Sequence, residues 1–245
     1  MLSERGRPSI FWIFATIAMP FVWIAVRYRF HDREKMPPNG AVIIAPNHYS
    51  NIDPVVMGVG VWYLKRAPRF MAKASILRIP VLGWLLRKSG QIPVERGGSS
   101  SKSVQSLKEA RELVSKGRAL IVYPEGSLTR DPGLWPMRGK SGAVRLALEL
   151  NIPIVPVASW GIQNVMGRYS NKLHAFPPKR VDIKVGDPVD LSEFTGKPLD
   201  AKLLAAATAK VMDEITKLLE DLRGEKAPAQ RWDPSQHNQS ETGKF

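Results

Sequence analysis

The sequence predicts an α/β domain. Three short apolar runs, at residues 41–45, 119–123 and 153–158, have the length expected of buried strands. Segments at residues 103–116 and 140–150 lie between them, and their apolar side chains recur at helical spacing. A chain of 245 residues is long enough for one such domain with a sizeable core.

The composition narrows the classes of function. The chain carries 36 Lys and Arg against 22 Asp and Glu, and its formal net charge of +14 favours an anionic partner: nucleic acid, an anionic membrane or a phosphorylated substrate. It has no cysteine, which excludes disulfides and thiolate chemistry. Its four histidines are scattered, and no metal-binding spacing, Walker loop or dinucleotide fingerprint is present. We therefore expect neither a metal nor another cofactor.

The N-terminal segment predicts a membrane-associated helix. Residues 10–26 are uncharged and rich in aromatic side chains; they are at the short end of the length for a spanning helix, and Pro20 would kink a helix midway. The arginines that flank the segment are Arg5, Arg7, Arg27, Arg29 and Arg33. Basic residues at both ends favour a broken or interfacial helix with both ends on one face over a simple span. The alternative is a helix buried in a soluble core.

Composition also predicts three parts of the chain. Prolines and a glycine at residues 36–40 mark a boundary. It separates an anchoring segment at residues 1–36 from the main domain at residues 37–224, which ends with a long amphipathic helix over residues 204–222. Residues 225–245 are polar and contain several prolines, so we expect a disordered tail.

A histidine and an aspartate lie in the turn between the first apolar run and the helix that follows it. His48 and Asp53 are five residues apart, which is about 140° on a straight helix, so only a turn can fold the carboxylate back onto the imidazole. Such a pair is a general base for a hydroxyl nucleophile: one ring nitrogen takes the proton, and the other donates to the carboxylate, which fixes the tautomer. The alternative is structural, with Asp53 as a helix N-cap and Pro54 in the first turn.

Further polar features follow the first strand and the second. Bases alternate with aromatic side chains over residues 62–88, as in nucleic-acid-binding proteins and in surfaces that rest on anionic lipid. The apolar N-terminal segment favours lipid, and a solvated basic face is the remaining alternative.

Arg96 precedes a glycine turn, where its planar guanidinium could bind a phosphate or form an ordinary salt bridge. Residues 124–133 place an acid, a hydroxyl and an arginine at a strand end, and residues 181–185 alternate like a half-exposed strand.

Four stretches in this order resemble the blocks of the glycerolipid acyltransferase family. They are Asn47-His48-x4-Asp53, Gly90-x-Ile92-x-Val94-x-Arg96, Tyr123-Pro124-Glu125-Gly126-Ser127 and Ile154-Val155-Pro156-Val157. The resemblance covers residues 37–190. It implies a mixed β-sheet wrapped by helices, of the glycerol-3-phosphate acyltransferase type, after an N-terminal hydrophobic segment that dips into one leaflet. It implies an enzyme that moves a fatty acyl chain from a coenzyme A or acyl-carrier-protein thioester to a glycerol hydroxyl.

The resemblance also assigns roles to residues. It implies that His48 is the catalytic base and that Asp53 orients it. Leu128 stands where the third block often has an arginine, which shifts the expected phosphate contacts to other bases. The residues expected to bind the acceptor are Lys73, Arg96, Glu125, Gly126, Ser127, Arg130 and Lys140, of which Lys73 and Lys140 match the family more loosely.

The reaction expected from the resemblance is acylation of the sn-2 hydroxyl of lysophosphatidic acid, which gives phosphatidic acid, at the cytoplasmic face of the cell membrane. The expected partners are anionic membrane lipid, the lysophospholipid acceptor and the acyl thioester donor, without nucleic acid and without a cofactor. Glycerol-3-phosphate, another lysophospholipid or a glycosylated inositol lipid are alternative acceptors. Two other classes remain open: a thioester hydrolase, and a non-catalytic basic module that binds membrane or nucleic acid.

Overall fold

A computed structural model of the chain describes residue 4 and residues 10–75, 80, 82–94 and 100–240. Its centre is a five-stranded sheet in the order β1-β7-β6-β2-β5. The strands are β1 (Val26–His31), β2 (Val42–Pro46), β5 (Ala119–Ile121), β6 (Ile154–Trp160) and β7 (Lys179–Val185). Neighbouring strands are parallel except β6 and β7, which run antiparallel. The sheet is therefore mixed, and the four strands predicted from apolar runs and alternation are confirmed.

A two-stranded parallel sheet continues the edge at β5. It consists of β3 (Met71–Lys73) and β4 (Ile92–Val94). Phe70, which precedes β3, forms a bridge with Ile121, and the Ile121 N–H donates to the Arg69 oxygen at 2.6 Å.

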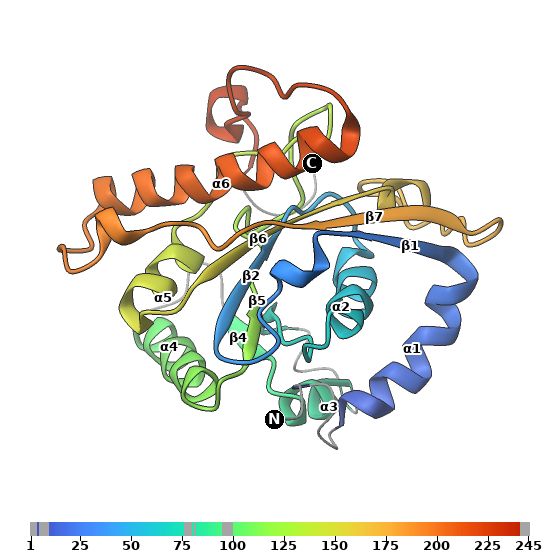
Figure 1. Ribbon diagram of the computed structural model, residues 1–245, viewed down its shortest axis with the longest axis horizontal. Helices are drawn as coiled ribbons and strands as arrows, with labels where there is room; N and C mark the ends of the chain where they lie inside the picture. The colour runs from blue at the N-terminus through green and yellow to red at the C-terminus, as the bar shows by residue number, and fades with distance from the viewer. Residues whose placement is uncertain (1–3, 5–9, 76–79, 81, 95–99, 241–245) are drawn as a thin grey trace.

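Helices cover both faces of the main sheet (Figure 1). The helix α6 (Ala201–Arg223) lies across one face, and α1 (Phe11–Ala25) and α2 (Asp53–Tyr63) lie on the other. The remaining α-helices are α3 (Leu82–Lys88), α4 (Ser100–Ser115) and α5 (Gly142–Leu150). Short 3₁₀ helices span Arg33–Lys35, Ile162–Asn164, Ser192–Phe194 and Pro234–His237.

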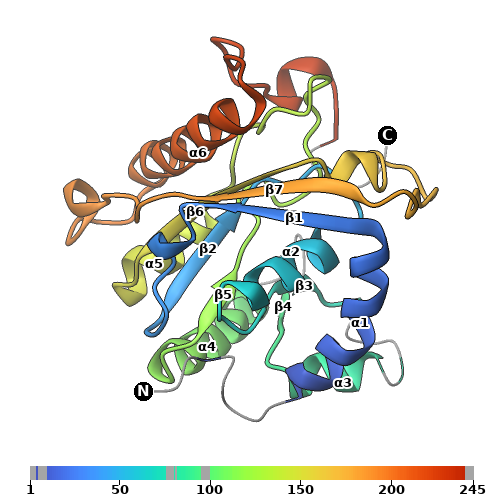
Figure 2. The ribbon, with the colours of Figure 1, turned by 45° about the vertical axis from the view of Figure 1, so that its right-hand side comes forward.

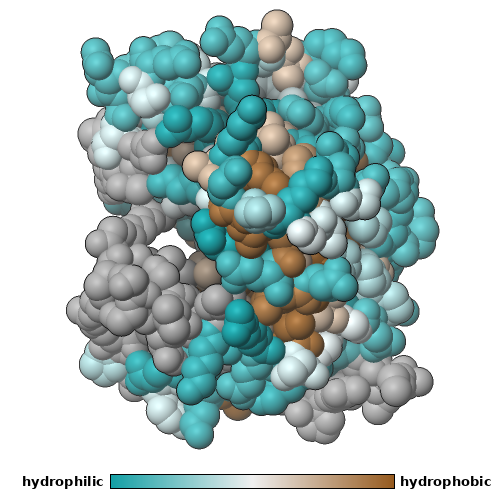
Figure 3. All heavy atoms as spheres, turned by 90° about the vertical axis from the view of Figure 1, so that its left-hand side faces the viewer, coloured by the Kyte–Doolittle hydropathy of each residue, from teal (hydrophilic) through white to brown (hydrophobic). Residues whose placement is uncertain are grey.

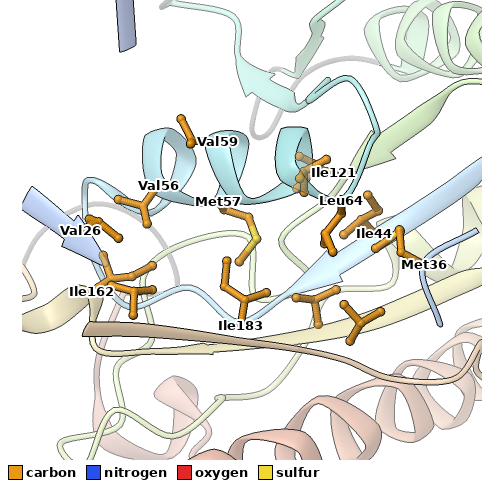
Figure 4. Close-up of a cluster of buried hydrophobic side chains, with 14 of the residues drawn as sticks. Val26, Met36, Ile44, Val56, Met57, Val59, Leu64, Ile121, Ile162 and Ile183 are labelled. Atoms are coloured by element: carbon orange, nitrogen blue, oxygen red, sulfur yellow. The ribbon is translucent and has the colours of Figure 1, made fainter. Parts of the chain in front are cut away.

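The alternation of side chains along β2 divides the core in two. Val42 and Ile44 belong to the cluster beneath α1 and α2, whereas Ile43 and Ala45 belong to the cluster shared with α4, α5 and α6. All of β2 is buried, as expected for a central strand with parallel neighbours on both sides. Figure 4 shows the first cluster, in which Met57 of α2 points toward Ile183 of β7.

The N-terminal segment forms the predicted helix and then differs from the expected organisation. The chain enters the main sheet at Val26, which pairs with Lys179, so residues 26–31 belong to the domain core and the expected boundary at residue 36 does not separate two units. Among the described residues, none of the helices combines the length with the apolar run that crossing a bilayer requires.

The basic and aromatic stretch at residues 62–88 is not one exposed face. Arg66 is fully buried and donates to the carbonyl oxygens of Pro37 and Gly40, both at 2.6 Å. Its Nε lies 2.9 Å from Glu4, which also forms an ion pair with Arg69. A guanidinium is buried only where acceptors and counter-charges replace water, so this part of the stretch holds separate chain segments together. Residues 76–79 and 81 lie outside the described residues.

The expected disordered tail is ordered over residues 225–240. Its Trp232 ring stacks on His237 at 3.6 Å, and Pro234 is buried. The Trp232 carbonyl accepts from the Arg138 N–H at 2.8 Å, and the Arg138 side chain pairs with Asp233 at 3.1 Å. A buried proline, a backbone hydrogen bond and an ion pair therefore fix a segment whose average composition is polar. Residues 241–245 lie outside the described residues.

Gly161, directly after β6, is a position at which the close packing against β7 can be tested. Its φ is +108°, and a Cβ there would overlap the backbone oxygen of Arg180 in β7. We expect Gly161→Ala to lower the free energy of unfolding by roughly 2 kcal/mol or more, because both the backbone conformation and the strand spacing oppose it. Urea unfolding would measure the loss. Gly142→Ala, at a helical position with no atom within 4 Å of the added Cβ, is the matched control and should be close to neutral. Equal stability of the two variants would contradict this account.

Candidate active site

The predicted dyad forms at the carboxyl end of β2. The chain leaves β2 at Pro46, turns through residues 47–52 and begins α2 at Asp53. Asn47 fixes the start of this turn: its side-chain amide donates to the Ser159 oxygen at 3.1 Å, and its oxygen accepts from the Ser159 N–H at 2.8 Å. The turn is thereby tied to the end of β6.

One oxygen of Asp53 organises the turn. Oδ2 lies 2.9 Å from His48 Nδ1 and accepts the backbone N–H groups of Tyr49 at 2.7 Å and Ser50 at 2.8 Å. The helix N-cap is Ile52, which makes no side-chain capping bond, so the alternative of Asp53 as N-cap does not hold. Asp53 is 1% exposed and lies at the N-terminus of α2, where the helix dipole favours a negative charge. The arrangement leaves His48 Nε2 as the ring nitrogen available for proton transfer.

Two aromatic rings stack beside the His48 imidazole. Tyr123 stacks on His48 with ring centroids 4.1 Å apart, and Phe70 stacks on Tyr123 at 6.2 Å. Burial, with a smaller contribution from the Asp53 charge, raises the pKa of the Tyr123 hydroxyl well above 10. Tyr123 therefore acts as a neutral platform. We did not assign it a role from the sequence, although its place at the start of the third block was a usable signal.

Glu125 joins the third block to the first. Its two oxygens accept the backbone N–H groups of His48 at 2.8 Å and Met137 at 3.1 Å. Burial raises the pKa of this fully buried carboxyl to about 8, although both donors favour the ionised form. Glu125 therefore positions the backbone at His48, and its complete burial differs from the acceptor contact that the resemblance implies.

His48 lines a largely apolar pocket of about 690 Å³. Its wall comes from α1, α2, the segment before β3 and the third block. Among the residues predicted for the acceptor, Gly126 and Lys140 line this pocket. Gly126 has φ +68°, and a Cβ there would lie 3.0 Å from the Lys140 side chain, so a glycine lets that chain cross the turn. Apolar side chains of α1 and α2 also line this pocket: Phe11, Ala15, Met19, Val55, Val59 and Trp62.

The remaining predicted acceptor residues lie elsewhere or outside the description. Arg130 is 1% exposed and donates to the Tyr169 hydroxyl and to the Ser240 carbonyl, so it is turned away from the pocket. Ser127 is buried behind the third-block turn. Lys73 lies in β3, but its side chain is outside the described part of the structure, and Arg96 lies entirely outside it. Within the described ranges, no group of three His, Asp or Glu side chains could hold a metal ion.

Comparisons with known proteins show the family of the chain. The family model described as Acyltransferase matches residues 27–160, more than half of the chain. A chloroplastic 1-acyl-sn-glycerol-3-phosphate acyltransferase of Brassica napus is 33% identical over 125 residues, which are 51% of this chain and 34% of the relative. A 1-acyl-sn-glycerol-3-phosphate acyltransferase of Bacillus subtilis is 25% identical over 193 residues, or 79% of this chain and 88% of the relative.

The fold also has a solved counterpart. The crystal structure of the 1-acyl-sn-glycerophosphate acyltransferase PlsC from Thermotoga maritima matches with a TM-score of 0.65 at 21% identity, covering 89% of this chain and 83% of that one. The chain spans between 34% and 53% of the length of the plant and algal relatives compared. Because the family model matches more than half of the chain, over residues 27–160, the chain belongs to the Acyltransferase family.

Proposed function

We propose that this chain is a membrane-associated O-acyltransferase that moves a fatty acyl group from coenzyme A or acyl-carrier protein to the sn-2 hydroxyl of lysophosphatidic acid. The product is phosphatidic acid. The observation that carries the proposal is the His48–Asp53 pair at the wall of an apolar pocket large enough for an alkyl chain. The names of the Brassica and Bacillus relatives support lysophosphatidic acid as the acceptor.

In the proposed mechanism His48 is the general base. Nε2 removes the proton of the acceptor hydroxyl while that oxygen attacks the thioester carbonyl. Asp53, held by the Tyr49 and Ser50 amides, stabilises the imidazolium that forms. As the tetrahedral intermediate collapses, the thiolate leaves and His48 returns the proton to it. The transfer is direct and needs no acyl-enzyme.

The pocket supplies the site for the acyl chain. Phe11, Ala15 and Met19 of α1 line it together with Val55 and Val59 of α2. Burying a methylene group against such a wall contributes about 0.8 kcal/mol. The acyl chain therefore extends from the thioester carbonyl at His48 into the space between α1 and α2.

Lys140 is the described base best placed for the acceptor phosphate. It lines the same pocket as His48 and Gly126. Arg96 and Lys73 remain proposed phosphate contacts from their places in and beside the blocks. Arg130 is left out of the proposed acceptor site because Tyr169 and Ser240 occupy its guanidinium. Leu128 is buried, so the third block offers no cation in the place where the family often has one.

We also propose that α1 holds the enzyme on the cytoplasmic face of the cell membrane. The helix carries six exposed large hydrophobic side chains on the side away from the pocket. They are Trp12, Ile13, Ile17, Phe21, Trp23 and Ile24. Apolar side chains exposed together in this number mark an interaction surface, and a membrane interface accommodates them better than water does.

His48→Ala should reduce acceptor-dependent thiol release and phosphatidic acid formation by about 10³-fold or more, because the hydroxyl then has no base. The assay combines palmitoyl-coenzyme A, lysophosphatidic acid and detergent-solubilised enzyme. His174→Ala, which removes an exposed histidine far along the chain, is the control and should keep wild-type turnover. Near-normal activity in His48→Ala would exclude the mechanism. Thiol release by the wild type without acceptor would indicate a hydrolase, and release only with another acceptor would reassign the substrate.

Lys140→Ala should raise the KM for lysophosphatidic acid by roughly 10- to 100-fold and change kcat little, as expected for the loss of one charge-assisted contact to phosphate. Initial rates at varied acceptor concentration would separate the two constants. Arg145→Ala, on the exposed side of α5 with a surface partner at Glu149, is the matched control. An unchanged KM in Lys140→Ala would move the phosphate to Arg96 or Lys73.

Glu125 should make stability depend on pH. Its pKa of about 8 lies above the value of 4.5 for an unfolded carboxyl, so the folded protein binds the extra proton between these pH values. The stability that this proton uptake contributes is fully present below about pH 4.5 and is lost as the pH rises through about 8. The free energy of unfolding of the wild type should therefore fall by a few kcal/mol over this range. Glu125→Gln should abolish that fall, as measured by urea unfolding at each pH. Glu193→Gln, at an exposed position, is the control. An identical pH profile for wild type and Glu125→Gln would refute the assignment.

A further inference from the structure

A second apolar surface lies at the same end of the molecule as α1. Ten large hydrophobic side chains are exposed among the described residues; six are on α1, and the most exposed of all, Phe176 at 81%, is on the loop between β6 and β7 together with Leu173 at 54%. We call Leu173 and Phe176 the loop tip. Nothing in the proposed chemistry uses this loop.

The loop tip and α1 lie side by side. The loop runs directly into Lys179, which pairs with Val26 at the junction of α1 and β1. Ala175, between the two tip residues, packs against the core cluster that contains Val22 and Ala25 of α1. Figures 1 and 2 both show this loop beside the α1–β1 junction, at the end of the sheet where β1 and β7 begin.

The charge around the loop tip has one sign. Residues 165–181 contain no Asp or Glu, and neither do residues 5–31. Arg27, Lys172 and Lys179 form no ion pair with any described residue, so their positive charges are not neutralised within that part of the chain. Aromatic and aliphatic side chains projecting from a basic surface fit the interface of an anionic bilayer, where the apolar groups insert and the bases meet head groups.

The base of the loop is bonded to the active-site turn. Ser50 Oγ donates to the Met166 oxygen at 2.7 Å, and Arg168 donates to the oxygens of Thr129 at 3.0 Å and Asp131 at 2.5 Å. The loop therefore connects the His48 turn and the third block to the exposed tip. Seating the tip on a surface would set the orientation of the dyad relative to that surface.

We propose that the loop tip is a second bilayer contact, which inserts Leu173 and Phe176 into anionic membrane beside α1. It rests on the proposed membrane association of α1 and adds a second point of contact, so that the enzyme is held in one orientation. Attachment through α1 alone would let the enzyme rotate about the axis of that helix. A second contact away from the axis would prevent this rotation.

Site-specific labelling tests the proposal, because the chain has no cysteine. Full-length Phe176→Cys carrying an environment-sensitive fluorophore would be mixed with vesicles of phosphatidylcholine and phosphatidylglycerol, and with vesicles of phosphatidylcholine alone. We expect a blue shift and quenching by lipids that carry a shallow spin label, both stronger with the anionic vesicles. Labelled Lys197→Cys, in the exposed loop before α6 at the opposite end, is the control and should show neither effect. That opposite end faces the viewer in Figure 3, where apolar patches are framed by hydrophilic side chains.

Vesicle sedimentation of unlabelled variants provides the second readout. Leu173→Ser combined with Phe176→Ser should weaken partitioning on the order of tenfold or more, while activity in detergent micelles and the thermal midpoint stay at wild-type values. Wild-type binding that the double variant retains in full, with no blue shift at position 176, would overturn the loop contact but leave α1 as the anchor. A wild type that binds neither vesicle would overturn the proposed membrane association as well. Loss of a dimer in the double variant, with unchanged vesicle binding, would replace lipid by a second copy of the chain.

Discussion

The single Asp53 oxygen that receives three donors governs the shape of the candidate active site. A carboxylate in a buried position is costly unless hydrogen bonds replace its hydration, and here the turn itself supplies them through Tyr49, Ser50 and the His48 ring. These three donors reach Oδ2 only because the chain folds back at this point. The same folded turn presents the His48 N–H to Glu125, so the third block is attached to the first through one peptide group. The geometry of the proposed dyad and the local folding of the turn thus have the same cause.

Much of the fold was predictable because its signals are local. The apolar runs of β2, β5 and β6 and the helical spacing of α4, α5 and α6 are each contained within a short stretch. The strand β1 was missed because it follows α1 without a break, and its arginines resemble the basic flank of a membrane segment. Arg66 was placed on a surface although it is buried, since its partner Glu4 is 62 residues away in the chain. The order of residues 225–240 depends on equally distant contacts, which composition does not record.

The site was predictable to the extent that the blocks carry it. His48 meets Asp53 as the first block implied, and Lys140 lines the same pocket as His48. Glu125 was expected to bind the acceptor, but it is fully buried against the His48 N–H and does not line that pocket. Arg130 was predicted to bind the acceptor, but a sequence motif does not show toward which side of a loop a charged side chain points. Here Tyr169 and Ser240 hold it on the far side. The stacking of Tyr123 on His48 was hidden for a related reason: a motif gives the order of residues but not the plane of a ring.

The helix α1 has no polar face, and it contributes side chains both to the pocket and to the surface. Phe11 and Met19 line the pocket while Ile17 and Phe21 point outward. On a bilayer, an alkyl tail could pass beside this helix without entering water, which avoids a cost of about 0.8 kcal/mol for each methylene group exposed on the way. Turnover would then follow the mole fraction of substrate in the plane of the membrane rather than its bulk concentration. Diluting the substrate with inert lipid would slow the enzyme even if the amount of substrate in the tube stayed the same.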